Sequence, residues 1–130
     1  ADPGDLPIVV AEKHRIDGSR AEVKFHRPVK GVAVIIDDET ATGGTLAQIA
    51  AAMPGAAKRF AAVTHLNGQA AKRLDADRHL DRLFATDTVS AASSEGSSKI
   101  EIVSIAKELA SAVAALDGNR SVTRWEFLEK

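Results

Sequence analysis

The stretch VAVIIDDETATGGTL, residues 32–46, decides the fold. Its aliphatic start, residues 32–36, predicts a strand. The polar segment that follows, residues 37–45, predicts a loop. The next apolar side chains recur every three or four residues, as on one face of a helix: Leu46, Ile49, Ala50 and Met53. Strand, loop and helix in this order indicate one unit of a parallel α/β sheet.

The same alternation continues on both sides of this stretch. Apolar or alternating segments predict five further strands, at residues 6–11, 21–25, 59–64, 83–86 and 100–103. A short helix is expected at residues 69–74 and a longer one after Ser104. The longer helix has an apolar stripe that we expect to be buried: Ile105, Leu109, Ala112, Val113 and Leu116. We therefore predict an α/β fold with a mainly parallel sheet flanked by helices.

Length and composition limit the function classes. The 130 residues, of 13.7 kDa, fit a single domain over residues 1–130. A net charge of -1 predicts no overall attraction to nucleic acid or anionic lipid. No apolar run has the length of a membrane span, and the absence of cysteine fits a reducing compartment, so we expect a cytoplasmic protein. Residues 1–5 resemble no signal peptide and are interpreted as an added remnant or a shortened start.

The predicted loop carries the groups of a ribose phosphate site. Gly43 and Gly44 let the backbone approach a ligand, and the amides at the start of the following helix suit a phosphate. Thr42 and Thr45 add hydroxyl donors. Carboxylates accept hydrogen bonds and repel phosphate, so the pair before the loop, Asp37 and Asp38, fits sugar hydroxyls. Each part also has a plainer explanation, because paired glycines are common in tight turns and paired aspartates at solvated strand ends.

Taken together, these residues carry a resemblance. Two acids, three variable residues and Thr-Gly-Gly-Thr after an aliphatic strand resemble the phosphoribosyl-diphosphate loop of the type I phosphoribosyltransferase fold. Further segments resemble, in the same order, the C-terminal half of the ribose-phosphate diphosphokinases, also called phosphoribosyl-diphosphate synthetases. These segments are AKRFAAVTH at 57–65, ATDTV at 85–89, and KIEI at 99–102.

The resemblance implies an activity and roles for individual residues. The family transfers the β,γ-diphosphoryl group of magnesium-ATP to the anomeric hydroxyl of ribose 5-phosphate, giving phosphoribosyl diphosphate and AMP. The charged segment at 12–15 resembles the start of the family's flexible catalytic loop, which makes Lys13 and Arg15 the implied catalytic cations. Asp37 and Asp38 would bind the ribose hydroxyls. The 5-phosphate would be held by Ala41, Thr42, Gly43, Gly44 and Thr45.

Histidine and basic residues outside the loop receive weaker assignments. His65 resembles the second residue of a Thr-His pair near the family's site, and we expect either a positioning role or a packed histidine. His14 is interpreted as a spacer between Lys13 and Arg15, and the other two histidines, His26 and His79, as surface residues. No histidine pair has the spacing of zinc ligands. A basic cluster interrupted by aspartates predicts a solvated, charge-balanced face: Lys72, Arg73, Arg78 and Arg82.

Departures from the family pattern leave alternatives open. Bacterial members usually have an aspartate where this chain has Ala41, and adenine phosphoribosyltransferases have alanine. The family's chain is more than twice as long, and a strand, a helix and an acidic loop should precede Leu6. We therefore expect the ATP site to need partner elements, as a homo-oligomer or a complex with an N-terminal-half domain. A small nucleobase phosphoribosyltransferase and a non-catalytic ribose-phosphate-binding module are the alternatives.

Overall fold

The computed structural model describes residues 7–15, 21–90, 96–118, 120 and 122. Four parallel strands form the main sheet, in the order β3-β4-β5-β6. These are β3 (Gly31–Thr40), β4 (Ala56–Leu66), β5 (Arg82–Thr86) and β6 (Ile100–Val103). The predicted α/β class and mainly parallel sheet are confirmed. The strands β3 and β4 are longer than predicted, because the backbone pairing between them continues as far as Thr40 on β3 and Leu66 on β4.

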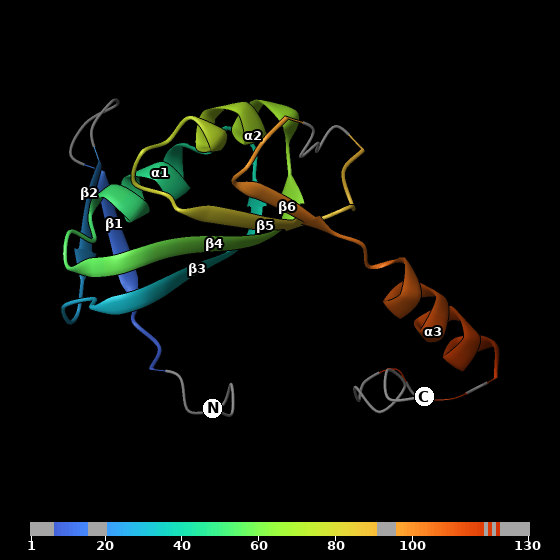
Figure 1. Cartoon of the computed structure of the whole chain (residues 1–130). Helices are drawn as coiled ribbons and strands as arrows, with labels where there is room; N and C mark the ends of the chain where they lie inside the picture. Colours follow the sequence, from blue (N-terminus) through green and yellow to red (C-terminus); the bar gives the residue numbers. More distant parts are fainter. Residues whose placement is uncertain (1–6, 16–20, 91–95, 119, 121, 123–130) are drawn as a thin grey trace.

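Two helices cover one face of the sheet. Figure 1 shows both α1 (Gly44–Ala51) and α2 (Gly68–Asp75) above it. The core between these layers is aliphatic, and its largest fully buried side chains are Leu46, Leu66, Leu74 and Leu83. Burial of each leucine contributes about 1.5–3 kcal/mol to folding. This layer fixes the position of α1 and α2 relative to the carboxyl end of β3, where the candidate site lies.

A separate two-stranded hairpin stands beside the start of the sheet (Figure 1). It consists of β1 (Ala11–Arg15) and β2 (Ala21–Phe25), which pair antiparallel from Ala11 opposite Phe25 to Arg15 opposite Ala21. The prediction of a strand at 21–25 is confirmed. The prediction at 6–11 is wrong for the described residues, because residues 7–10 form no strand. Ile8 is 82% exposed, so this apolar segment is not buried in a sheet as its composition predicted.

The opposite face of the main sheet is not covered by a described helix. Val32, Val34 and Ile36 project from β3 on this face and are 64%, 54% and 81% exposed. The third helix, α3 (Ala106–Asp117), runs out beyond β6 in Figure 1 instead of packing on the sheet. Within the described part of the chain, the helices that flank the sheet thus lie on one of its faces.

The apolar stripe of α3 is exposed as well. Leu109, Val113 and Leu116 are 56%, 65% and 60% accessible to solvent, whereas the sequence predicted their burial. The spacing of these residues correctly predicted a helix, but spacing cannot specify which surface the stripe contacts. The described residues supply no surface for it. The C-terminal tail predicted at 122–128 lies almost entirely outside the described residues.

Candidate functional site

The strand β3 carries the two aspartates of the motif. The sequence predicted a loop from residue 37, but β3 continues to Thr40, so Asp37 and Asp38 are strand residues. Successive strand residues point to opposite faces. Asp37 is half-buried on the helix-covered side with Ile35, whereas Asp38 is exposed. A ligand that contacts both carboxylates must therefore reach around the edge of β3.

The ionisation of Asp37 is shifted by its environment. Burial raises the pKa of the Asp37 carboxyl above its usual value, and a backbone hydrogen bond from Asp38 partly offsets this effect. That bond runs from the Asp38 N–H to Asp37 Oδ1 at 3.1 Å. Asp38 Oδ1 in turn accepts a 2.8 Å bond from the Glu39 N–H. The two aspartates are thus held by local backbone contacts that leave further acceptor capacity on each carboxylate.

The predicted phosphate loop lies between β3 and α1. Ala41 and Thr42 are exposed, and Gly43 is the N-cap of α1 with φ 72° and ψ 0°, a left-handed conformation that favours glycine. The Gly43 carbonyl accepts the first helical bond from the Ala47 N–H, at 3.0 Å. Glycine has no side chain with which to cap the helix. The N-terminus of α1 carries the partial positive charge of the helix dipole and suits an anion.

Close packing of α2 explains the glycine at position 43, whereas the space at Gly44 would admit a Cβ in ordinary van der Waals contact. A Cβ on Gly43 would lie 2.9 Å from Leu74 Cγ and 3.3 Å from the Ala70 carbonyl oxygen, so a side chain there would clash. A Cβ on Gly44 would lie 3.5 Å from Arg73 Nη1 and 3.6 Å from Thr42 Oγ1. The loop is therefore pressed against α2, with the Arg73 guanidinium and the Thr42 hydroxyl beside Gly44.

A second polar group forms where β4 and β5 end. The Thr64 carbonyl accepts hydrogen bonds from Thr86 Oγ1 at 2.6 Å and Thr88 Oγ1 at 2.8 Å. His65 Nδ1 lies 2.7 Å from Thr88 Oγ1. The Thr88 hydroxyl also lies 3.0 Å from Thr86 Oγ1, and it has one proton for these contacts. If Thr88 donates to the Thr64 carbonyl, it accepts from His65 Nδ1–H; if it donates to Nδ1, the Thr86 hydroxyl alone donates to that carbonyl. Nε2 is then the atom that remains for another partner.

This histidine lies next to the aspartate strand. Glu39 on β3 pairs in register with His65 on β4, two residues beyond the pairing of Asp37 with Val63. Parallel strands bring their carboxyl ends to one edge of the sheet, which is where ligands bind in open α/β folds. The structure thus brings Asp37, the loop and His65 to the same edge.

The implied catalytic cations belong to the hairpin. Lys13 and Arg15 are β1 residues, opposite Val23 and Ala21 on β2. Their side chains, that of His14 and all of residues 16–20 lie outside the described residues. The start of the expected flexible loop is therefore an arm of a hairpin as far as Arg15.

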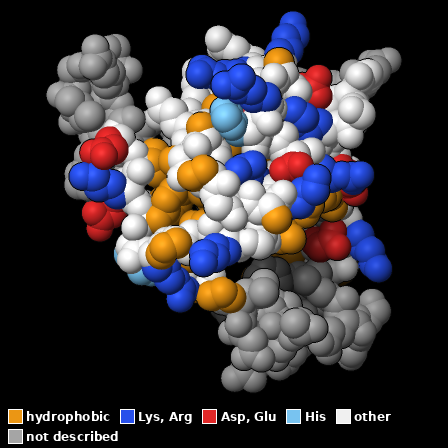
Figure 2. Space-filling model, turned by 60° about the vertical axis from the view of Figure 1, so that its left-hand side comes forward, with side chains coloured by type: hydrophobic (Ala, Val, Ile, Leu, Met, Phe, Trp, Pro, Cys, Tyr) orange, Lys and Arg blue, Asp and Glu red, His pale blue; other side chains and the backbone are white. Residues whose placement is uncertain are grey.

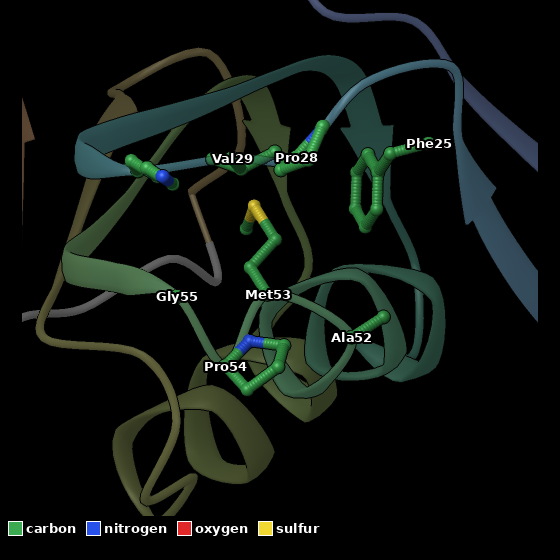
Figure 3. Close-up of a pocket in the computed structure, with 8 residues that line it drawn as sticks. Phe25, Pro28, Val29, Ala52, Met53, Pro54 and Gly55 are labelled. Carbon is green, nitrogen blue, oxygen red and sulfur yellow. The ribbon is translucent and has the colours of Figure 1, made fainter.

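A pocket lies at the opposite end of the sheet from the loop. It has a volume of about 210 Å³ and lies where the chain enters β3 and β4. Figure 3 shows Met53 pointing from the end of α1 toward Val29 and Pro28, with Phe25 nearby. Its lining is mainly apolar. The pocket offers few polar groups to a sugar phosphate and is not the candidate site.

Comparisons with known proteins agree with this fold. No family model matches the chain. It is 33% identical over 129 residues to ribose-phosphate pyrophosphokinase 1 of Listeria innocua and 35% identical over 127 residues to the ribose-phosphate pyrophosphokinase of Hyphomonas neptunium. These alignments cover 95% and 92% of this chain and 40% of each relative. The chain is homologous to one domain of the ribose-phosphate pyrophosphokinases.

The homology extends to the folded structure. Phosphoribosylpyrophosphate synthetase from Mycobacterium smegmatis matches with a TM-score of 0.74 and 26% sequence identity, over 89% of this chain and 38% of that one. This chain thus spans about two-fifths of the length of the ribose-phosphate pyrophosphokinases it matches. No helix among the described residues is long and apolar enough to cross a membrane.

The described residues do not form a self-contained metal site. Within residues 7–15, 21–90 and 96–118, no three His, Asp or Glu side chains are grouped as metal ligands. Magnesium commonly binds through one or two carboxylates together with substrate phosphates. Asp37 and Asp38 fit that limited role, and they could hold magnesium only as part of a magnesium-nucleotide substrate.

One residue of the predicted solvated basic cluster lies near the loop. Arg73 is exposed, as that prediction requires, and its guanidinium lies beside Gly44. Figure 2 shows lysine and arginine side chains gathered near the top, the side on which Figure 1 places α1 and α2. The nearness of Arg73 to Gly44 follows from its position in the helix after the next strand, because consecutive helices on one face of a parallel sheet are neighbours.

Proposed function

We propose that this chain is the ribose 5-phosphate-binding domain of a ribose-phosphate diphosphokinase. The observation that carries the proposal is the glycine loop between β3 and α1, held against α2 by the Gly43–Leu74 packing, in a chain homologous to that family. The 5-phosphate binds at Ala41, Thr42, Gly43, Gly44 and Thr45, where the first-turn amides of α1 donate to its oxygens.

The ribose lies on the β3 side of this loop. Asp37 and Asp38 lie on β3 just before the loop, and they accept hydrogen bonds from the hydroxyl groups of the ribose. Their opposite strand faces place the ribose across the strand end, with one carboxylate on either side. Protonation would turn one Asp37 oxygen from an acceptor into a donor, so the raised pKa of Asp37 makes sugar binding weaken at a higher pH than an ordinary aspartate would.

His65 acts as a positioning residue at the same edge. With the Thr88 hydroxyl donating to the Thr64 carbonyl, His65 takes the Nδ1–H tautomer, so Nε2 can accept a hydrogen bond from a sugar hydroxyl or, when protonated, donate one to a phosphate. The hydrogen bonds of Thr86 and Thr88 to the Thr64 carbonyl hold Thr88 in place, and Thr88 in turn orients the His65 ring before a ligand binds. Such prior ordering reduces the entropy lost on binding.

In the complete enzyme the bound sugar accepts a diphosphoryl group. Its anomeric hydroxyl oxygen forms a bond to the β-phosphorus of ATP and gives up its proton to water. The bond from that phosphorus to the oxygen bridging to the α-phosphate breaks, and AMP leaves with that oxygen. Lys13 and Arg15 stabilise the negative charge that develops on the transferred group. Magnesium enters with ATP and neutralises its phosphates. These steps fit a cytoplasmic protein of nucleotide biosynthesis.

Completion of the ATP site requires partner elements. Among the described strands, β3 pairs only with β4, so one edge of this strand is open. The uncovered sheet face and the exposed stripe of α3 add apolar surface. These surfaces support association with a second copy or with a domain equivalent to the remaining three-fifths of the relatives' length.

Calorimetric titration tests the proposal. Ribose 5-phosphate should bind more tightly than either ribose or inorganic phosphate, because the site contacts both ends. When the chain is combined with an N-terminal-half domain and magnesium-ATP, AMP should form. Release of diphosphate that depends on a nucleobase would instead support the phosphoribosyltransferase alternative, which Ala41 favours. Binding without turnover in the complemented protein would support a non-catalytic module.

A further inference from the structure

The pocket beside Met53 lies between two parts of the fold. One wall is formed by Phe25, at the end of β2, and by residues 28–30, which lead into β3. The other wall is formed by residues 52–55, which lead from α1 into β4. Figure 3 shows the Met53 side chain pointing from one wall toward the other, with the Phe25 ring beside it. A ligand in this pocket would therefore contact both the hairpin and the end of α1.

The walls of the pocket are ordered by contacts within the chain. The Met53 carbonyl accepts hydrogen bonds from the Ala56 N–H at 3.1 Å and from the Arg59 guanidinium at 2.7 and 3.0 Å, which fix the turn after α1. The two walls come together at Gly55, where a Cβ would lie only 2.9 Å from the Val29 carbonyl oxygen. A site that is formed in advance loses less entropy when a ligand binds.

The size and lining of the pocket limit the class of ligand. Its volume is about 210 Å³. An apolar cavity of about 150 Å³ accommodates benzene, whereas pockets for larger ligands measure about 300–1,000 Å³. The pocket therefore fits one substituted ring and is too small for a nucleotide. An aromatic ring there would pack against Phe25 and contact the thioether of Met53, both of which are favourable.

One lining residue indicates the charge of the ligand. Of the eight residues that line the pocket, Lys30 is the one with a charged side chain. Lys30 is exposed, so its ammonium group can stay hydrated at the mouth while its stem lies along the apolar wall. A carboxylate on the ring would lie beside this group. Because an exposed ion pair contributes little, the ring supplies most of the affinity and the carboxylate adds selectivity.

We propose that this pocket binds a monocyclic aromatic carboxylate, with the ring between Phe25 and Met53 and the carboxylate at Lys30. The pocket lies where the chain enters β3 and β4, at the end of the sheet opposite the glycine loop. It is therefore a second site, and it does not depend on the proposed ribose 5-phosphate site.

Amide ¹H–¹⁵N chemical shifts test this inference with three probes. Benzoate should cause saturable changes at the non-proline residues of 25–30 and 52–55, with a Kd of about 1 mM. Benzyl alcohol, which has the ring without the charge, should bind about two- to fivefold more weakly. Acetate, which has the charge without the ring, should cause no saturable change in these residues.

Substitutions separate the roles of the ring and the charge. Lys30→Gln should weaken benzoate binding by about two- to fivefold and leave benzyl alcohol unchanged, whereas Lys72→Gln, at an exposed position on α2, should change neither. Ala52→Leu extends a side chain into the pocket and should weaken both ring-containing probes by about tenfold or more. Ala52→Ser, of similar size to the wild type, should retain binding. Thermal melts check folding, and the exposed Lys30→Gln change keeps the test open if Ala52→Leu does not fold.

Three results would overturn the inference. The first is the absence of saturable changes around Met53 in the wild type, or benzoate binding at residues 42–46 in their place. The second is equal affinity for benzoate and benzyl alcohol, or equal effects of Lys30→Gln and Lys72→Gln. The third is full binding in a folded Ala52→Leu variant. None of these results alters the prediction for ribose 5-phosphate at the glycine loop, because the two sites lie at opposite ends of the sheet.

Discussion

Gly43 lies directly against Leu74, so closely that a Cβ on the glycine would be 2.9 Å from Leu74 Cγ. This relationship joins the start of α1 to a fully buried side chain of α2. Through it, the hydrophobic core sets the position of the loop that we assign to phosphate. A binding loop fixed in this way is ordered before the ligand arrives.

Replacement of this glycine should damage both stability and binding. Gly43→Ala introduces a strained positive φ, worth about 1–2 kcal/mol, and a clash with Leu74. We expect a loss of about 2–4 kcal/mol in the free energy of unfolding, measured by urea denaturation. Gly31→Ala is the matched control, because Gly31 has φ 69° but no atom within 4 Å of its Cβ position. Equal losses in both variants would contradict the importance of the Leu74 contact.

The raised pKa of Asp37 predicts that one substitution will weaken ligand binding without weakening the fold. In the folded state burial disfavours the ionised carboxyl, so its contribution to stability is present at low pH and is lost as the pH rises through the folded pKa. Asp37→Asn should therefore keep or slightly raise stability at pH 7, by up to about 0.5 kcal/mol. Its affinity for ribose 5-phosphate should fall by about tenfold or more, since a charged acceptor is lost.

The pH dependence of binding checks the same residue. Wild-type affinity should decline with acid at a pH above that expected for an ordinary aspartate, because the raised pKa brings protonation earlier. The Asp37→Asn variant should lack this component. A wild-type profile that matches the variant's would show that Asp37 does not contact the sugar.

The ionised carboxyl of Asp81 should stabilise the fold, in contrast to that of Asp37. A backbone hydrogen bond from Arg59, then the side-chain bond from Lys58, holds the pKa of Asp81 below its usual value. Its contribution is therefore present above the unfolded pKa and is lost as the pH falls through the folded pKa. Asp81→Asn should lower stability at pH 7 by about 0.5–1 kcal/mol and flatten the acid dependence in denaturant titrations. Unchanged acid dependence would contradict this assignment.

Much of this fold was predictable from local sequence, and its packing was not. The aliphatic run at 32–36 and the glycines at 43 and 44 correctly predicted a strand followed by a helix start. Residues 37–40 were assigned to a loop because they are polar, yet the ladder to β4 extends the strand through them. Polar composition alone does not end a strand that has a hydrogen-bonded partner.

Contacts between distant segments were the main source of error. The exposed stripe of α3 has the same spacing as a buried one, so Leu109 gives no sign in sequence of what covers it. Arg73 is exposed as predicted, but its nearness to Gly44, which is far away along the chain, could not be predicted from its charged neighbours in sequence. The Asp37 and Asp38 motif indicated a sugar site, but only the strand geometry places them on opposite faces.

The tautomer of His65 provides a test that does not depend on activity. Thr88→Val removes the acceptor of His65 Nδ1–H, and ¹⁵N chemical shifts of the imidazole should show a loss of the Nδ1–H preference. Thr88→Ser, which keeps the hydroxyl, should restore it. Affinity for ribose 5-phosphate should fall by several-fold in the valine variant only. An unchanged tautomer in Thr88→Val would contradict the positioning role.

The uncovered face of β3 should tolerate charge in the isolated chain. Ile36 is 81% exposed, so Ile36→Lys should alter the free energy of unfolding by less than about 0.5 kcal/mol. Leu83→Ala, on a fully buried residue of the same sheet, should cost about 2–5 kcal/mol. Sedimentation analysis should show weaker association of Ile36→Lys with a second copy or with an N-terminal-half domain. Equal association of variant and wild type would place the partner surface elsewhere.

The central claim is that the loop between β3 and α1 binds the phosphate of ribose 5-phosphate. Amide ¹H–¹⁵N chemical shifts, recorded while ribose 5-phosphate is added to the wild-type chain, test it most directly. We predict saturable changes that are largest at residues 42–46, followed by residues 37–39, with smaller changes at the same loop on addition of inorganic phosphate. Changes confined to the apolar pocket around Phe25 and Met53, or no saturable change at the loop, would contradict the claim.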